Sequence, residues 1–261
     1  MNENSVDTSI CAVIPTKDNM RTIRKCLESV LPVTSNIVVV DSGSTDGTVA
    51  LCEKFGAKVI HRSWPGMVKQ RQFCLDQAIE FDWILILDSD ESLDQELQKS
   101  IIALKKNEID LAIDGFTFNR KVWFLGGWLH HVFQPEHRLR VVRGGAAIVK
   151  GIGPEGLGGP DRLEVKGRVE HLPGVCKHDS WEDLDDMLQS YIRLGRRAAL
   201  YDPKPSKPYM IFLNPLVAFF KQYVLKRGYK DGHRGFVASA GVACGTMIKQ
   251  IQKNEQRRSS G

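Results

Sequence analysis

The sequence has no run of about 18 apolar residues, so no part of it is expected to cross a bilayer as a helix. The apolar stretch that comes nearest, 209–225, is interrupted by Asn214, Pro215, Lys221 and Gln222. The opening residues MNENSVDTS contain neither a basic nor an apolar segment, so no secretory signal is predicted. We therefore expect a cytoplasmic protein.

Paired cysteines are also lacking. Six cysteines are scattered along the chain and none belongs to a CxxC pair; they are Cys11, Cys26, Cys52, Cys74, Cys176 and Cys244. In a chain of 261 residues this pattern is typical of buried free thiols in a reducing compartment rather than of a disulfide framework.

The sequence contains no Gly-rich phosphate loop of the GxGxxG or GxxxxGK[ST] kind. A nucleotidyltransferase or sugar-phosphate pyrophosphorylase usually has such a loop after its first strand, and IPTKDN stands there instead. The net charge of +5 is mild, and the basic residues do not interleave with a stacking surface, so no nucleic-acid partner is predicted.

What is present is an alternation of strand and helix patterns over the first hundred residues. Strands are predicted at 10–14, 37–40, 58–61 and 83–87, and helices at 20–31, 45–55, 67–80 and 93–104. This order predicts an α/β fold with a mostly parallel, Rossmann-like sheet covered by helices on both faces. Ligands of such sheets bind outside the carboxyl ends of the strands.

The pattern changes in the second half of the chain. Two further strands are predicted at 115–124 and 138–143, and 150–160 is predicted to be a glycine-rich loop. Helices are expected at 181–198, 210–226 and 232–251.

The strongest chemical signal is the segment WILILDSDE, in which a buried strand leads into Asp88 and Asp90. Residues i and i+2 of an extended chain point the same way, so both carboxylates can face one ligand. Two such groups can hold a hard divalent cation and leave positions for diphosphate oxygens. The alternative is that they begin the helix that follows.

Two loops after the first and second strands carry further polar groups. Pro15-Thr16-Lys17-Asp18-Asn19 follows the first strand, and DSGSTDGT begins at Asp41 after the second. Asp41 can accept hydrogen bonds from a base or ribose. Asp46 is expected to cap the following helix.

These segments resemble those of inverting family 2 glycosyltransferases of the GT-A fold, and most resemble the subgroup that adds glucose or a related hexose to the lipopolysaccharide inner core. The resemblance extends over nearly the whole chain, in IPTKDN, VVVDSGSTDGT, KQRQFCLDQA, WILILDSDE, PEHRLRVVR, HDSWEDLDDMLQSY and KRGYKDGHRGF. It implies a GT-A catalytic domain over 1–205, with a nucleotide-binding half at about 9–110 and an acceptor half at about 111–205. A helical, membrane-associated extension at 206–261 would follow.

The resemblance also implies the roles of individual residues in the donor site. The nucleotide pocket would be formed by Pro15, Thr16, Lys17, Asp18 and Asp41. Asp88 would lie near the ribose or metal, and Asp90 would be the principal ligand of Mg²⁺ or Mn²⁺. Arg71 would approach the donor, or else lie on a solvated helix face.

Three further assignments concern the second half of the chain. His178 is similar to a family histidine that helps bind the metal or diphosphate; a capping or core role is the alternative. Arg138, which shares a basic strand face with Arg140, would pair with the diphosphate or orient the base, or form a surface ion pair. The aromatic loop 123–133 either lines the acceptor cleft or forms a small satellite core.

Inverting transfer needs a carboxylate that takes the proton of the acceptor hydroxyl. Glu155 is the only carboxylate between Glu136 and Asp161, and the family places the base in this loop, so Glu155 is the candidate. Pro154 stands where the subgroup usually has His, and Glu136 and Asp161 are the alternatives.

The resemblance favours UDP-glucose as donor and a glycolipid or saccharide as acceptor. The alternatives are a pyrophosphorylase and a non-catalytic member of the fold. Much of the positive charge lies late in the chain, at Lys204, Lys207, Lys221, Lys226, Arg227, Lys230, Arg257 and Arg258. This suits peripheral contact with the anionic inner face of the cytoplasmic membrane, and a solvated basic surface is the other interpretation.

Overall fold

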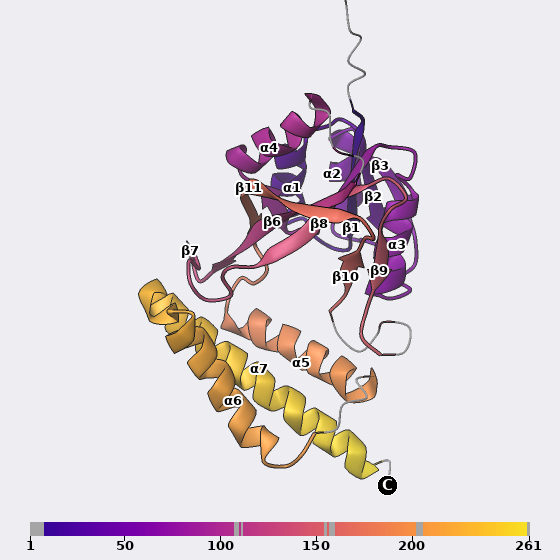
Figure 1. Cartoon of the computed structure of the whole chain (residues 1–261). Helices are drawn as coiled ribbons and strands as arrows, with labels where there is room; N and C mark the ends of the chain where they lie inside the picture. The colour runs from indigo at the N-terminus through magenta and orange to yellow at the C-terminus, as the bar shows by residue number, and fades with distance from the viewer. Residues whose placement is uncertain are drawn as a thin grey trace, which may run out of the picture. The chain divides into compact units, whose positions relative to one another are not determined.

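The computed structural model describes residues 8–106, 110, 112–153, 156, 160–201 and 206–259. The chain divides into two compact units (Figure 1). Unit 1 comprises the described residues within Met1–Arg120, His137–Lys150 and Arg162–His178. Unit 2 comprises those within Lys121–Glu136, Gly151–Asp161 and Asp179–Gly261.

Unit 1 is built on the predicted parallel strands. These are β1 (Ile10–Thr16), β2 (Ile37–Asp41), β3 (Lys58–His61) and β4 (Trp83–Ile86), in the spatial order β3-β2-β1-β4. The helices between them are α1 (Ile23–Val30), α2 (Thr48–Lys54) and α3 (Met67–Asp76). Each neighbouring pair is parallel, which confirms the predicted βαβ connections.

The same sheet continues beyond β4 with antiparallel pairs. The order is β4-β8-β6-β11-β5, and β8 runs antiparallel to both β4 and β6. The strands are β5 (Glu91–Leu93), β6 (Ile113–Phe124), β8 (His137–Arg143) and β11 (Arg168–His178), and helix α4 (Gln95–Lys106) follows β5. Strand β7 (Gly127–Trp128) pairs with β6, and β9 (Ile148–Lys150) pairs with β10 (Arg162–Glu164) in a separate small sheet.

The core of unit 1 has two halves, one on each face of the sheet. In β4, Trp83 and Leu85 contribute to one cluster, and Ile84 and Ile86 contribute to the other. Residues of α1, α2 and α4 complete the first cluster, and residues of α3 complete the second. Strands buried on both faces are what a helix-covered parallel sheet requires, so the predicted α/β class is confirmed.

Unit 2 is mostly helical. Helices α5 (Leu184–Tyr201) and α6 (Met210–Phe220) both pack against α7 (Gly232–Ser259). A π-helical turn, Lys221–Leu225, and a 3₁₀ helix, Gly228–Asp231, connect α6 to α7. Among the helices of the described residues, none is long and apolar enough to traverse a membrane.

The aromatic loop 123–133 forms a satellite core within unit 2. Phe124, Leu129 and Val132 are buried together with Met187 of α5. The carboxylate of Asp231 holds the loop by accepting backbone N–H groups of 130–132 at 2.8–2.9 Å. Of the two interpretations of this loop, packing is the one that the contacts support.

We expect a methyl group at Gly174, within β11, to destabilise the protein. This residue has a φ of +100°, and a Cβ atom there would lie 2.2 Å from the Leu97 backbone nitrogen. Gly56 is a matched control, since its φ is +78° but nothing lies within 4 Å of its Cβ position. Gly56→Ala should cost about 1–2 kcal/mol of unfolding free energy, and Gly174→Ala about 1–3 kcal/mol more from overpacking. Equal urea midpoints for the two variants would contradict this packing.

Candidate active site at the ends of strands β1 and β4

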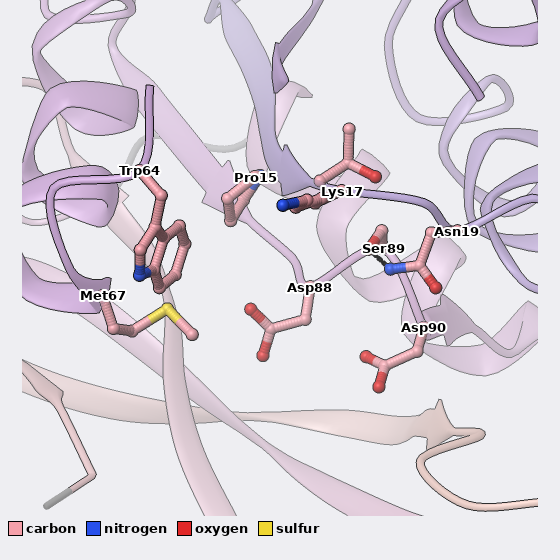
Figure 2. A pocket seen from close by; sticks show the side chains of 9 residues that line it. Pro15, Lys17, Asn19, Trp64, Met67, Asp88, Ser89 and Asp90 are labelled. Atoms are coloured by element: carbon pink, nitrogen blue, oxygen red, sulfur yellow. Dashed lines mark hydrogen bonds between the residues drawn. The ribbon is translucent and has the colours of Figure 1, made fainter. Parts of the chain in front are cut away.

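Two neighbouring parallel strands end at the same edge of the sheet and bring their polar loops together. β1 ends at Thr16, and its pairing with β4 places Val13 opposite Ile86, two residues before Asp88. A cavity of about 270 Å³ opens there. It is lined by Pro15, Thr16, Lys17, Asn19, Trp64, Met67, Asp88, Ser89 and Asp90 (Figure 2).

The two aspartates of the DSD segment share this cavity, as the sequence predicts. Figure 2 shows both carboxylates pointing to the same side, with the Trp64 ring across the opening from Asp88. One oxygen of Asp90, Oδ1, is buried without a hydrogen-bond partner, and so is the Thr16 hydroxyl. Buried polar atoms nearly always have a hydrogen-bond partner, so two buried oxygens without one in the same cavity indicate a place for a ligand.

The residues around Asp90 suit a divalent cation. Asp90 Oδ2 lies 3.3 Å from Nε2 of His178, which stands at the end of β11 opposite Glu91 of β5. A carboxylate and an imidazole are both groups that bind divalent cations in proteins. No cluster of three or more His, Cys, Asp or Glu side chains fit for a metal occurs in the described part of the chain. A cation at this site would therefore need oxygen atoms from a bound small molecule, such as a diphosphate, to complete its coordination.

A buried network of arginines and carboxylates holds Asp88. Arg71 donates to Asp88 Oδ1, and Arg140 donates to Asp88 Oδ2 at 2.9 Å. Arg140 also donates to Glu91 Oε1 at 2.8 Å, and Arg120 donates to the same oxygen at 3.1 Å. Glu91 Oε2 in turn accepts the backbone N–H of Asp88 at 3.0 Å. Together these hydrogen bonds stabilise the turn that carries Asp88 and Asp90.

This network keeps its carboxylates ionised. Burial would raise the pKa of Asp88, but Arg71 and Arg140 outweigh burial and hold that pKa far below its ordinary value. Burial likewise opposes ionisation of Glu91, and Arg140 and Arg120 lower the pKa of Glu91 nevertheless. Both oxygens of Asp88 accept hydrogen bonds from guanidinium groups, so Asp90 is the better candidate for a ligand of the cation.

The structure decides between the interpretations of Arg71 and adds two residues that the sequence analysis missed. Arg71 is buried against Asp88, so the solvated-face interpretation is wrong. Arg140 and Glu91 were not predicted as site residues. The signals were there, since Arg140 alternates with apolar neighbours in β8 and Glu91 directly follows the DSD segment.

A β-bulge positions Arg140. In the β6–β8 ladder Phe116 pairs with Val141 and Thr117 with Leu139, so Arg140 is the extra residue between them. Bulges commonly re-aim side chains near active sites. Arg138, two residues earlier, is half-buried and does not line the cavity.

The loop after β2 is held both by its own hydrogen bonds and by hydrogen bonds to the loop after β1. The buried Asp41 carboxylate accepts the backbone N–H groups of Gly43 and Ser44 at 2.9 and 3.1 Å. Burial opposes its ionisation, yet the hydrogen bonds from Ser44 and Gly43 lower its pKa. Asp18 accepts the N–H of Thr45 at 2.7 Å.

Asp46 was predicted to cap α2, and it satisfies an N–H group at the start of that helix from the position before the N-cap. Gly47 occupies the N-cap position of α2, and Asp46 accepts the N–H of Thr48, the first helical residue, at 3.0 Å.

The candidate bases remain predictions. Glu155, with Pro154 before it, lies outside the described residues. Glu136 and Asp161 belong to unit 2.

A mixed α/β sheet with an aspartate pair after the fourth strand, beside a cavity at the strand ends, is typical of GT-A glycosyltransferases. The chain belongs to glycosyl transferase family 2, whose family model matches residues 11–152.

Similar proteins agree with this membership. An uncharacterized glycosyltransferase of Rickettsia conorii is 42% identical over 97 residues, which cover 37% of this chain and only 34% of that relative. The lipopolysaccharide core biosynthesis glycosyltransferase LpsC of Rhizobium meliloti is 27% identical over 229 residues, covering 82% of this chain and 80% of LpsC.

A solved structure shares the fold. The mannosyltransferase PcManGT of Pyrobaculum calidifontis, solved with GDP-Man and Mn²⁺, has a TM-score of 0.53 at 14% identity, covering 94% of this chain and 87% of that one.

We expect Glu91→Gln to cost about 3–5 kcal/mol of unfolding free energy at neutral pH, because it leaves two buried guanidinium groups short of a carboxylate. The pKa of Glu91 is lowered from 4.5 by folding. Its contribution is therefore complete above pH 4.5 and is lost as the pH falls through the lower folded value.

Urea unfolding at neutral pH and near pH 4 measures this. The gap between wild type and variant should narrow at the lower pH. The matched control is Glu28→Gln, because Glu28 is 54% exposed and pairs with Arg24 on the surface. Such pairs contribute at most about 1 kcal/mol. Equal losses for the two variants would contradict the buried network.

Proposed function

We propose that the protein is a metal-dependent, inverting hexosyltransferase that moves a sugar, with glucose favoured, from a UDP-sugar to a hydroxyl of a glycolipid or lipopolysaccharide-core-like saccharide. The observation that carries this proposal is the shared cavity of Asp88 and Asp90 at the ends of β1 and β4. Membership of glycosyl transferase family 2 supports the transfer chemistry. The name of the relative LpsC supports a lipopolysaccharide-core acceptor.

The donor would bind along the sheet edge. Thr16, with its orphaned hydroxyl, and Lys17 would contact the nucleotide or diphosphate, and the partly exposed Trp64 would form the opposite wall. We assign Pro15, Asp18 and Asp41 to the frame of this pocket, and Arg71 to the support of Asp88. Arg138 stays a candidate for diphosphate contact or orientation of the base.

Asp90 and His178, with Asp88 beside them, would hold Mg²⁺ or Mn²⁺. Such a cation, when bound, neutralises negative charge on the departing diphosphate. Asp90 Oδ1 is buried and has no hydrogen-bond partner, which supports Asp90 as a ligand of the cation. PcManGT was solved with Mn²⁺, which is consistent with a cation in this fold.

The acceptor hydroxyl must lose its proton as it attacks the anomeric carbon. We assign this role to Glu155, with Glu136 and Asp161 as alternatives. Within this scheme residues of about 9–110 bind the donor, those of about 111–205 serve the acceptor, and 206–261 form a helical extension.

A screen of nucleotide sugars scored by released nucleotide tests the donor and the cation. UDP-glucose with Mn²⁺ or Mg²⁺ should give the fastest release, and a chelator should abolish it. Asp90→Asn should lower kcat/KM by about 10²–10³-fold, because it removes the anionic ligand. Asp76→Asn, at an exposed aspartate at the end of α3, is the matched control and should behave as wild type.

Full activity of Asp90→Asn would contradict the cation site. Release of pyrophosphate from a nucleoside triphosphate and a sugar phosphate would instead identify a pyrophosphorylase. The configuration of the product, followed by NMR from an α-linked donor, should be β if the transfer is inverting.

Glu155→Gln should lower kcat by about 10²–10⁴-fold, which is the usual contribution of a general base. Donor binding should change little, so the KM for the nucleotide sugar should stay near that of wild type. Glu136→Gln and Asp161→Asn are the comparison variants. If one of them loses activity while Glu155→Gln retains it, the base is that other residue.

A further inference from the structure

Helix α6 exposes a continuous apolar face. Six side chains at helical spacing are each more than half exposed; they are Tyr209 (55%), Phe212 (72%), Leu213 (52%), Leu216 (69%), Val217 (56%) and Phe220 (51%). We call these six residues the α6 apolar face. A helix of a globular protein normally turns such a stripe toward its core, so this stripe needs an apolar partner outside the described fold of unit 2.

The opposite side of α6 already has its partner. Pro215 is buried, and α6 packs along α7 (Figure 1). Phe219 stacks on Tyr223 and meets Phe236 of α7 edge to face. The helix is therefore held in place by one side while the α6 apolar face stays uncovered.

The chain segment that contains this face carries positive charges only. Between Ser206 and Lys230 there are five basic residues and no acidic one; the basic residues are Lys207, Lys221, Lys226, Arg227 and Lys230. The acidic residue that follows, Asp231, is occupied by the backbone N–H groups of the loop 130–132. Glu136 lies near Lys226, and the exposed cations Lys207, Lys221, Arg227 and Lys230 flank the apolar face at both ends of α6.

The length of α6 decides how it would meet a bilayer. The eleven residues of α6 and the five of the π-helical turn that continues it make a helix of at most about 24 Å, which is shorter than the hydrocarbon thickness of about 30 Å. Such a helix cannot span, but an apolar face flanked by lysines suits the plane of the interface.

We propose that the α6 apolar face inserts into the headgroup region of an anionic lipid bilayer, with Lys207, Lys221, Arg227 and Lys230 contacting lipid phosphates. The inference rests on the proposed function in one respect, that the acceptor is lipid-linked. A second copy of the chain is a poorer occupant, because a two-fold interface brings identical surfaces together and would oppose these cations to one another.

Co-sedimentation of the full chain with phosphatidylcholine vesicles, with and without phosphatidylglycerol, tests the proposal. We expect binding to the anionic vesicles that weakens as salt is added. Phe212→Asp/Leu216→Asp should lower the partition constant at least about tenfold, and Lys221→Gln/Arg227→Gln should lower it about tenfold. All four side chains are exposed, and the melting temperature checks that the variants remain folded.

The matched controls lie in unit 1. Ile79→Asp changes an apolar side chain that is 60% exposed, and Lys54→Gln/Lys99→Gln removes two exposed charges. Both should bind vesicles as wild type does. Absence of wild-type binding to anionic vesicles, or equal losses in the controls, would overturn the proposal. The proposal would also be overturned if the wild type forms a dimer in solution, does not bind vesicles, and becomes a monomer when Phe212→Asp/Leu216→Asp is introduced. Vesicle binding needs no donor, so its failure is distinguishable from failure of sugar transfer, which is measured by nucleotide release.

Discussion

The ion pairs of Arg140 are the interaction on which the rest of the site depends. Asp88, Asp90 and Glu91 place three carboxylates within four residues, and Asp88 is close enough to Glu91 to oppose its ionisation. Arg140 bridges these two, and Arg71 and Arg120 complete the neutralisation from α3 and β6. Removing any one of these charges from a buried network leaves another without compensation. Since the charges of Asp88 and Glu91 are compensated by arginines, the turn after β4 can present Asp90 to the cavity.

Much of the parallel part of the sheet, from β1 to β4, was predictable from local patterns. The four parallel strands are short runs of β-branched and apolar residues, and β1, β2 and β3 are each followed directly by a helix. Parallel neighbours end at the same edge, so the proximity of Thr16 and Asp88 followed from strand order alone. The antiparallel strands were harder. β11 contains Pro173 and Gly174, which argue against a strand in sequence, and β5, β9 and β10 have three residues each.

The details of the site depended on tertiary contacts that local patterns do not contain. Arg140 reaches Asp88 because a bulge in β8 alters the alternation, and bulges leave no reliable trace in periodicity. The role of Asp41 in nucleotide binding stays a prediction, and the hydrogen bonds that its carboxylate accepts from the backbone of Gly43 and Ser44 were not evident from the sequence pattern. Trp64 lines the cavity from the loop between β3 and α3, where no strand or helix pattern places it.

The distribution of the cysteines has a practical consequence. Cys11, Cys26, Cys52, Cys74 and Cys176 are buried, and burial raises the pKa of each thiol, to about 11 for Cys11 and Cys52 and to about 12 for Cys74. The prediction that all six would be buried was wrong for Cys244, which is exposed on α7. Thiolates are the reactive species, so electrophilic dyes would attach to the native protein at Cys244. A fluorophore at that position would report on the helical unit alone and leave the sheet and its aspartates unmodified.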